Sequence, residues 1–309
     1  MNKLLDNIPS EEWVQDRKEY LGGSELAAAF GKSKYQTPLQ LWMIKTGRME
    51  PQGSSPITEL GHILESVVAE KFTETTGLKA RNRSQAYQHP RHCFLRGNID
   101  RQITSSNLHD SPGVLEIKTT SSQRLKHEEN LYPLSWEYQI QWYLFLSGYS
   151  YSYLAIMERD TGVFHEPILI QRNQELIDEL FEKAVTWWNT HILADIPPDP
   201  MNNEDMLILF PNSEEGKILV ATPGSYGLYN ELCKVRDRKS DLEKMEEYLQ
   251  VQLKQKLGDH ELLQCGSKKL ISWKSSTQNR LDTPAFKQAH PELYKQFLKQ
   301  TSTRRFTVH

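Results

Sequence analysis

The sequence predicts a mixed α+β fold with a central sheet flanked by helices, and three observations support this class. Short helical patterns fill the first third of the chain, strand-like runs follow, and further amphipathic or fully apolar helices come between and after the strands. At 309 residues the chain is long enough for one large domain with an appendage. We therefore expect a core over residues 1–200 and a C-terminal extension over residues 201–309, with a long helix and small strands.

Four helical patterns precede the first strands. The first covers residues 11–20. After the break at Gly22 and Gly23, Ser24 can cap a helix over residues 25–30. Thr37 and Pro38 begin the next, over residues 37–47. The pattern over residues 61–77 has apolar residues at helical spacing, namely Ile63, Leu64, Val67, Val68 and Phe72.

Strand patterns then alternate with helices. Residues 94–104 and 113–120 predict two antiparallel neighbours joined by a turn-rich loop. Residues 137–148 are apolar nearly all round and predict a buried helix. Residues 151–170 predict a hairpin that closes on Thr161 and Gly162. An amphipathic helix over residues 174–192 follows.

The extension begins after a linker predicted over residues 194–205. Residues 226–258 predict one long helix with apolar positions three and four apart, at Leu242, Met245, Leu249 and Leu253. Strand patterns over residues 260–264, 268–274 and 304–308 surround a helical pattern over residues 284–299. No internal repeat is present.

Composition is that of an ordinary globular protein. Hydrophobic residues make up 38% and charged residues 25% of the chain, mean hydropathy is −0.64, and no apolar run approaches the ~20 residues that cross a bilayer. The N-terminal residues lack the apolar segment and cleavage site of a signal peptide. We therefore expect an intracellular protein that does not insert into a membrane.

Charge and cysteine content bear on two further classes, nucleic-acid-binding proteins and cysteine-ligated metalloproteins. The net charge is −3, so a nucleic-acid-binding role requires basic residues to gather locally. The three cysteines, Cys93, Cys233 and Cys265, are far apart and form no CxxC pair. This pattern argues against a tetrathiolate metal site or an iron–sulfur cluster.

The strand GVLEIKTT, residues 113–120, carries an unusual charged face. Because successive strand side chains point to opposite faces, Leu115 and Ile117 share one face while Glu116 and Lys118 share the other. A solvated surface ion pair is the usual meaning of such a pattern. Asp100, in the strand expected to pair with this one, favours another meaning. Two carboxylates on adjacent strands repel each other unless a proton or a cation such as Mg²⁺ or Mn²⁺ lies between them.

A third acid, Glu65, lies in the helix over residues 61–77. Taken alone, it is most simply a surface residue of a helix, as Asp100 and Lys118 alone are ordinary strand residues. Their order along the chain, a helix Glu, a strand Asp and then Glu-x-Lys, suits phosphodiester hydrolysis. We expect one or two divalent ions held by Glu65, Asp100, Glu116 and the backbone carbonyl of Ile117, with Lys118 at the attacking water or a phosphate oxygen.

These motifs resemble a known nuclease signature. GNID followed by LEIK is similar to the PD-(D/E)xK signature, and the phrases LGGSELAAAFGKSKYQTPLQLWMIKTG, GHILESVVAE, LEIKTT and YQIQWYLFLSG resemble the YqaJ-like viral recombinases, a family that includes lambda exonuclease. The resemblance covers roughly the first two thirds of the chain, in family order. It implies a restriction-endonuclease-like core and a metal-dependent deoxyribonuclease.

The resemblance also implies roles for single residues. Glu65, Asp100, Glu116 and Lys118 match the active-site acids and lysine. Gln141 matches the helical glutamine that closes the site, although a hydrogen bond within the core also explains it. Arg17 and Ser24 match residues that bind the 5′-phosphate, and a helix cap also explains Ser24. Asn98 stands where the exonuclease branch can have a phosphate-binding serine.

The function that follows is a 5′ to 3′ exonuclease that acts on double-stranded DNA ends and exposes single strands for recombination. An endonuclease or an end-resecting enzyme of other polarity is one alternative, and a DNA-binding module without catalysis is another. The resemblance suggests a trimeric ring, a single-strand annealing protein as partner, and the cytoplasm of a bacterial or phage-infected cell. For the extension, an oligomer contact, a partner-docking surface and a DNA clamp through Lys274, Arg304 and Arg305 stay open.

Overall fold

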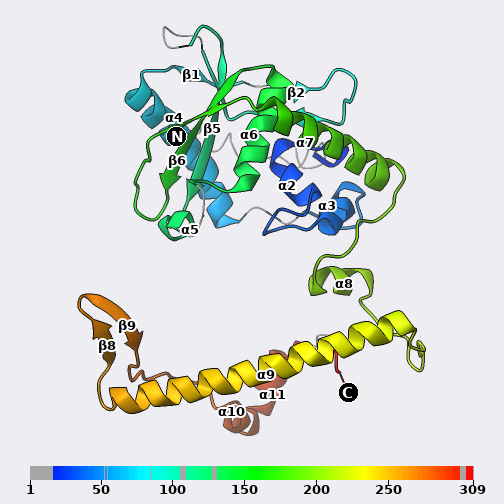
Figure 1. Cartoon of the computed structure of the whole chain (residues 1–309), viewed down its shortest axis with the longest axis vertical. Coiled ribbons are helices and arrows are strands. Elements are labelled where there is room, and N and C mark those ends of the chain that lie inside the picture. Colours follow the sequence, from blue (N-terminus) through cyan, green and yellow to red (C-terminus); the bar gives the residue numbers. More distant parts are fainter. Residues whose placement is uncertain are drawn as a thin grey trace. The chain divides into compact units, whose positions relative to one another are not determined.

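The computed structural model describes residues 17–51, 53, 55–83, 85–104, 109–126, 131–299 and 304–308. The chain divides into two compact units, Met1–Leu209 and Phe210–His309 (Figure 1). Most of the helix expected over residues 11–20 lies outside the described residues, and its end forms the short 3₁₀ helix η1, Arg17–Glu19. No helix in the described part of the chain has the length and apolar character needed to cross a bilayer.

A five-stranded mixed sheet forms the centre of the first unit, in the order β1-β4-β5-β6-β7. Only β5 and β6 pair in parallel, with Glu116 opposite Leu154, and the other neighbours are antiparallel. The predicted α+β class and the antiparallel pair are therefore confirmed. The strands are β1, Ala80–Arg81; β4, Arg101–Ile103; β5, Gly113–Thr120; β6, Tyr151–Glu158; and β7, Ile168–Gln171. A separate two-stranded sheet pairs β2, Tyr87–Gln88, with β3, Arg96–Gly97.

Helix α6, Leu134–Ser147, makes the crossover that a parallel pair of strands requires. A short helix α5, Ser122–Lys126, lies between β5 and α6. Buried residues occur nearly all round α6, as predicted, and the helix ends at Gly148 with a φ of 72°. The buried helix thus separates β5 from β6 in the sequence and covers the face of the sheet toward which Glu116 and Lys118 point.

Helix α4, Pro56–Thr76, covers the opposite face of the sheet (Figure 1). Its Val68 and Phe72 pack in one cluster with Leu115 and Ile117 of β5. The helix begins earlier than predicted, because the Ser55 hydroxyl accepts a hydrogen bond from the Thr58 amide and Pro56 occupies the first turn. Two of the apolar residues in the predicted pattern are not buried, since 43% of Ile63 and 40% of Val67 is exposed.

The N-terminal helices pack against α6. They are the 3₁₀ turn η2, Gly23–Glu25, with α2, Leu26–Ala29, and then α3, Pro38–Lys45. Thr37 caps α3 as predicted, its hydroxyl accepting from the Gln40 amide at 3.2 Å. Ser24 is not a cap. The Gly22 amide instead donates to Glu25 Oε2 at 2.9 Å.

The rest of the first unit differs from the prediction at its end. The hairpin of β6 and β7 and the helix α7, Gln174–Trp187, are confirmed, and α7 continues as the π-helix η3, Trp188–Leu193. Helix α8, Asn203–Leu209, begins inside the predicted linker. Its buried Asp205 accepts hydrogen bonds from the Thr37 hydroxyl and the Met201 amide, both at 2.8 Å. The predicted linker is therefore fixed to α3.

The second unit contains the predicted long helix, α9, Pro223–Leu257, in which Leu257 is the buried residue. A hairpin follows, β8, Leu262–Cys265, and β9, Lys268–Ser272. The pattern over residues 284–299 splits into α10, Thr283–Ala289, and α11, Pro291–Gln296, because Pro291 starts a new helix. The strand expected over residues 304–308 was wrong, since that segment has no regular secondary structure.

Candidate active site

Glu116 and Lys118 meet on the face of β5 that looks toward α6. Lys118 Nζ lies 2.7 Å from Glu116 Oε1 and donates a hydrogen bond to Gln139 Oε1 of α6 at 2.9 Å. Glu116 is completely buried, while 20% of the Lys118 side chain is exposed. Apart from the ion pair, neither oxygen of Glu116 accepts a hydrogen bond within the described chain. This is a costly position for a carboxylate that has only a structural role.

Asp100 lies at the edge of β5. It occupies the bend directly before β4 rather than the strand itself, and its Oδ2 accepts a hydrogen bond from the Ile117 amide at 2.7 Å. Because the N–H and C=O of one strand residue point to the same side, the Ile117 carbonyl also points toward Asp100. Strand β4 pairs with β5 only up to Leu115. Beyond it, the Asp100 side chain takes the place of a strand partner at this edge of β5.

Glu65 reaches the same region from α4. Gly61, one turn earlier on the same side of the helix, lets α4 approach β5 closely, since a Cβ there would lie 3.2 Å from Thr119 Oγ1. Glu65 Oε1 lies 2.9 Å from His62 Nδ1, and its Oε2 lies 3.8 Å from an Arg101 guanidinium nitrogen. Both partners hold the carboxylate at the edge of the sheet, where 21% of its side chain is exposed.

The three acids and the lysine interact electrostatically. Burial, and then repulsion from Glu116 and Glu65, raises the pKa of Asp100 well above its ordinary value, although Lys118 and the Ile117 amide act against this rise. Burial also raises the pKa of Glu116, with Lys118 opposing. Burial lowers the pKa of Lys118, but the carboxylates of Glu116 and Asp100 outweigh it, and the net shift is upward. The structure thus brings together Glu65, Asp100, Glu116 and Lys118.

These residues fit a hard divalent cation. The donors are a buried carboxylate without hydrogen bonds apart from its ion pair, a second carboxylate whose pKa is raised by burial and then by the first, and a backbone carbonyl that points to the same edge. Among the described residues, no three His, Cys, Asp or Glu side chains converge into a complete metal cage. Mg²⁺ needs no such cage, because it keeps several waters and often takes only one or two protein carboxylates.

Gln141 is not part of this cluster, which corrects its predicted place. Its side chain is buried on another side of α6, where it donates to Glu137 Oε1 at 2.9 Å and to the Gln171 carbonyl at 2.8 Å. Its Oε1 accepts from the Asn173 amide at 2.8 Å. Gln141 therefore ties α6 to the end of β7, which is the core role that the sequence also allowed.

Gln139 occupies the place that the sequence assigned to Gln141. It accepts from Lys118 and donates from Nε2 to the Tyr143 hydroxyl at 3.0 Å. Burial, and then the charges of Glu116 and Asp100, raises the pKa of Tyr143 well above its ordinary value. Gln139 and Tyr143 lie one turn apart on α6, so they support Lys118 as a unit.

Arg17 and Ser24 form a second polar group close to the first. An Arg17 guanidinium nitrogen donates to the Ser24 hydroxyl at 3.0 Å and lies 3.2 Å from Glu25 Oε1. A Cβ on Gly23 would lie 2.9 Å from the Tyr143 ring, so η2 packs directly on the helix that carries Gln139. The structure therefore places Arg17 and Ser24 beside α6. Asn98 is exposed.

A buried cation that no sequence pattern predicted lies beside this group. Lys45 ends α3 and looks like a surface lysine, yet only 1% of its side chain is exposed. It lies 2.8 Å from Glu25 Oε2 and donates to the Tyr20 and Arg17 carbonyls. Arg17 is thus held by an internal carboxylate, Glu25, that shares its charge with a buried lysine.

Comparisons with known proteins agree with the motifs. A model of the YqaJ-like viral recombinase domain matches residues 12–150. The uncharacterized protein YqaJ of Bacillus subtilis (strain 168) is 29% identical over 307 residues, which cover 96% of this chain and 93% of the relative.

Among solved structures, an alkaline exonuclease (LHK-Exo) from Laribacter hongkongensis is 16% identical with a TM-score of 0.48, over 60% of this chain and 94% of that one. A phage related exonuclease from Haemophilus somnus 129PT is 14% identical with a TM-score of 0.43, over 57% of this chain and 96% of that one. Likeness at these levels does not establish a shared activity. The match confirms the resemblance indicated by the motifs, and residues 12–150 are similar to the YqaJ-like viral recombinase domain.

Proposed function

We propose that this protein is a Mg²⁺- or Mn²⁺-dependent deoxyribonuclease, a phage-type exonuclease that degrades one strand of double-stranded DNA ends in the 5′ to 3′ direction. One observation supports it most: the buried Glu116 carboxylate has oxygens without hydrogen bonds, a lysine 2.7 Å away and Asp100 at the same strand edge. The viral recombinase domain supports a recombination role for the single strands that result.

The chemistry of this proposal divides among few residues. Asp100, Glu116 and the Ile117 carbonyl would hold the metal, and Glu65 would contact it directly or through water. A bound divalent ion supplies a water of lowered pKa and positive charge at the phosphate. Lys118, fixed between Glu116 and Gln139, would donate to a non-bridging phosphate oxygen or to the attacking water. Tyr143 would hold Gln139 in place.

Recognition of the DNA end is assigned to Arg17 and Ser24. The guanidinium and the hydroxyl are already in contact, so an anion that binds one of them also meets the other. Glu25 opposes the anion, and Lys45 offsets part of that charge. The exposed Asn98 would contribute a weaker contact. A trimeric ring and a single-strand annealing partner belong to this proposal on the motif resemblance alone.

The test is digestion of linear duplex DNA that carries one labelled 5′ end, either phosphorylated or with a free hydroxyl. The proposal expects label release as mononucleotide with Mg²⁺ or Mn²⁺, none with EDTA, and faster release from the phosphorylated end. Closed circular duplex in parallel separates the alternatives. Internal cuts in the circle would indicate an endonuclease, and binding without cleavage under either metal would indicate a DNA-binding module without catalysis.

A further inference from the structure

The two units have opposite net charges. The first, residues 1–209, has 20 Lys and Arg against 28 Asp and Glu, a formal charge of −8; the second, residues 210–309, has 17 against 12, a formal charge of +5. Most of the excess lies in residues 254–309, with 11 Lys and Arg against 4 Asp and Glu. The basic residues therefore gather in the unit that does not hold the candidate active site.

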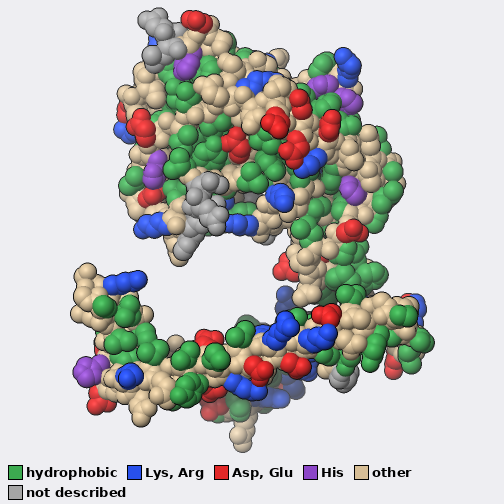
Figure 2. Space-filling view, viewed as in Figure 1, with side chains coloured by type: hydrophobic (Ala, Val, Ile, Leu, Met, Phe, Trp, Pro, Cys, Tyr) green, Lys and Arg blue, Asp and Glu red, His purple; other side chains and the backbone are tan. Residues whose placement is uncertain are grey.

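These cations are available to an anionic ligand. All 11 are exposed. Within the described residues, only Lys274 and Lys295 lie within ion-pair distance of a carboxylate, 3.6 Å from Glu261 and 2.9 Å from Glu292. The other nine are Lys254, Lys256, Lys268, Lys269, Arg280, Lys287, Lys299, Arg304 and Arg305. Figure 2 shows Lys and Arg side chains at several places over this unit, interleaved with hydrophobic ones.

Exposed aromatic rings accompany the cations. Among the described residues, the exposed Phe and Trp side chains all lie in the second unit, namely Phe210, Trp273, Phe297 and Phe306, with 54%, 48%, 78% and 77% of each exposed. An exposed ring beside cations offers a surface on which a base can stack. A cation is adjacent or nearly adjacent in the sequence to three of them, at Lys274, Lys299 and Arg305.

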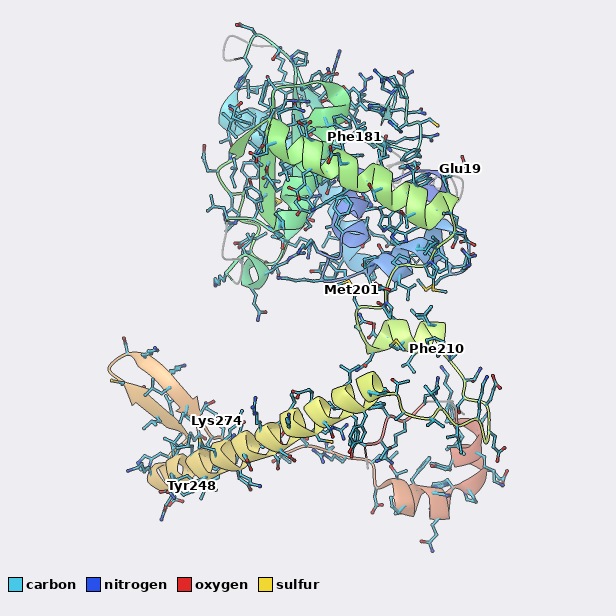
Figure 3. All side chains as sticks on the ribbon, turned by 45° about the vertical axis from the view of Figure 1, so that its right-hand side comes forward. Glu19, Phe181, Met201, Phe210, Tyr248 and Lys274 are labelled. Atoms are coloured by element: carbon cyan, nitrogen blue, oxygen red, sulfur yellow. The ribbon has the colours of Figure 1, made fainter. Side chains whose placement is uncertain are left out.

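In two places, a cation also lies close in space to one of these aromatic residues. At the base of the β8–β9 hairpin, Lys254 Nζ lies 5.8 Å from the centre of the Trp273 ring, and the Trp273 amide donates to the Glu261 carbonyl at 2.9 Å. Figure 3 shows Lys274 at this end of α9. At the second place, an Arg304 guanidinium nitrogen donates to the Phe210 carbonyl at 2.9 Å, which brings Arg305 and Phe306 to the start of the unit.

We propose that the second unit binds single-stranded DNA, with Lys and Arg at the phosphates and bases stacked on Trp273, Phe306 and their neighbouring rings. Duplex DNA offers phosphates but hides the faces of its bases, whereas a single strand presents both. Cations alone would suit a duplex, so the exposed rings decide for a single strand. The choice of DNA over RNA rests on the proposed function, whose product is a single strand.

An anionic membrane also attracts cations and aromatic rings, but none of the four exposed Phe and Trp rings among the described residues lies on the long helix α9. Interfacial binding uses a long amphipathic helix with one apolar face. Three of the rings lie at the end of the hairpin, at the end of the 6-residue α11, and in the irregular segment over residues 304–308. Such scattered positions suit successive bases of a strand better than one membrane plane.

The test is fluorescence anisotropy with the full chain in EDTA, so that no cleavage occurs, using labelled oligo(dT) and a labelled duplex with blocked ends. The variants are Trp273→Ala with Phe306→Ala, and Lys268→Glu with Lys269→Glu. Tyr248→Ala with Lys244→Glu, exposed residues of α9, is the matched control. The ring variant should weaken oligo(dT) binding about tenfold per ring, with duplex binding unchanged. The lysine variant should reduce the salt dependence of oligo(dT) binding.

Three results would overturn the inference. The first is oligo(dT) affinity that the ring variant leaves at the control value. The second is an equal loss for oligo(dT) and duplex, which would indicate phosphate contacts alone. The third is unchanged oligo(dT) binding together with lost binding to phosphatidylglycerol vesicles, which would assign the surface to a membrane. Failure of the nuclease proposal would appear separately, as wild-type protein that binds DNA but does not cleave it with Mg²⁺ or Mn²⁺.

Discussion

Lys118 Nζ lies 2.7 Å from Glu116 Oε1, on the side of β5 that faces α6. The two residues are two positions apart in a strand, so the pleat alone brings them to one face. Removing either partner leaves the other with a buried and unbalanced charge, which is more costly than the pair itself. The pair and the nearby Asp100 carry one excess negative charge when both acids are ionised, which a proton or a cation can offset, and the effect of a cation can be measured without any substrate.

Glu116→Gln should abolish stabilisation by divalent metal. In wild-type protein, Mg²⁺ or Mn²⁺ at 100 times its dissociation constant should raise the free energy of unfolding by about 2.7 kcal/mol. The variant loses a carboxylate ligand and should show no such rise. Thermal unfolding with metal and with EDTA measures this difference. Glu70→Gln, an exposed acid on α4, is the control and should keep the full rise. An equal rise in both variants would place the metal elsewhere.

Gln139→Ala should mainly lower the cleavage rate, whereas Gln141→Ala should mainly lower the stability. Gln139 holds Lys118, so its loss should reduce kcat by about tenfold to a hundredfold and change stability by less than about 1 kcal/mol. Gln141 makes three hydrogen bonds inside the core, so its loss should cost about 2–4 kcal/mol of unfolding free energy. Urea unfolding and initial cleavage rates separate the two. The reverse pattern would restore Gln141 to the site.

The sequence pattern did not show which of the two glutamines contacts Lys118. The alternation in β5 fixed the face of Glu116 and Lys118, because a strand has only two faces. In α6 the apolar residues lie nearly all round, so the sequence does not indicate which side of the helix faces the site. Gln139 and Gln141 are two residues apart and therefore point in different directions. Lys45 at the end of α3 likewise carries no sequence sign of burial. Long-range packing decides both cases.

The presence of helices and strands was more predictable from the sequence than the residues at which they begin. The antiparallel pair, the buried helix and the long α9 were predicted from periodicity. The early start of α4 depends on one cap, Ser55, and the start of α8 depends on hydrogen bonds to Asp205 from Thr37 and Met201. Such contacts form only after the chain has folded. Asp100 was expected within a strand and lies one residue before it, where it binds the Ile117 amide.

Glu25 should make the stability of the first unit sensitive to acid. Burial raises the pKa of Glu25, but Lys45, Arg17 and the Gly22 amide outweigh burial, so its pKa in the folded protein lies below the ordinary 4.5. The pKa of Lys45 is also lowered, because burial there outweighs the attraction of Glu25. The charged Glu25 therefore stabilises the fold at pH above about 4.5. This contribution should be lost as the pH falls through the lowered value.

Glu25→Gln tests this effect. At neutral pH the variant should lose about 3–5 kcal/mol of unfolding free energy, because Lys45 stays buried without its carboxylate. Below the ordinary pKa of Glu25 the difference between variant and wild type should shrink. Urea unfolding measured from neutral pH to pH about 3 follows this convergence. A difference that stays constant over this range would show that the loss comes from packing rather than from charge.

Arg17→Ala should reduce the preference for a 5′-phosphorylated end. We expect about a tenfold loss of kcat/KM on phosphorylated duplex and little change on duplex with a 5′-hydroxyl, because only the phosphate uses the guanidinium. Ser24→Ala should give a smaller loss in the same direction. Arg48→Ala, which removes an exposed arginine paired with Asp195, is the control. Equal losses on both substrates would mean that Arg17 supports the fold instead of the end contact.

The proposed nuclease activity depends on a divalent metal held by the carboxylates around Lys118. The most direct measurement is the initial rate of nucleotide release from linear duplex DNA by wild type, Glu116→Gln and Glu70→Gln, each with Mg²⁺, Mn²⁺ or EDTA. Wild type and Glu70→Gln should release nucleotide only with metal, and the rate should fall at least about a thousandfold in Glu116→Gln, because a ligand of the metal is lost. Release by Glu116→Gln at the wild-type rate, or no release by wild type with either metal, would contradict the proposal.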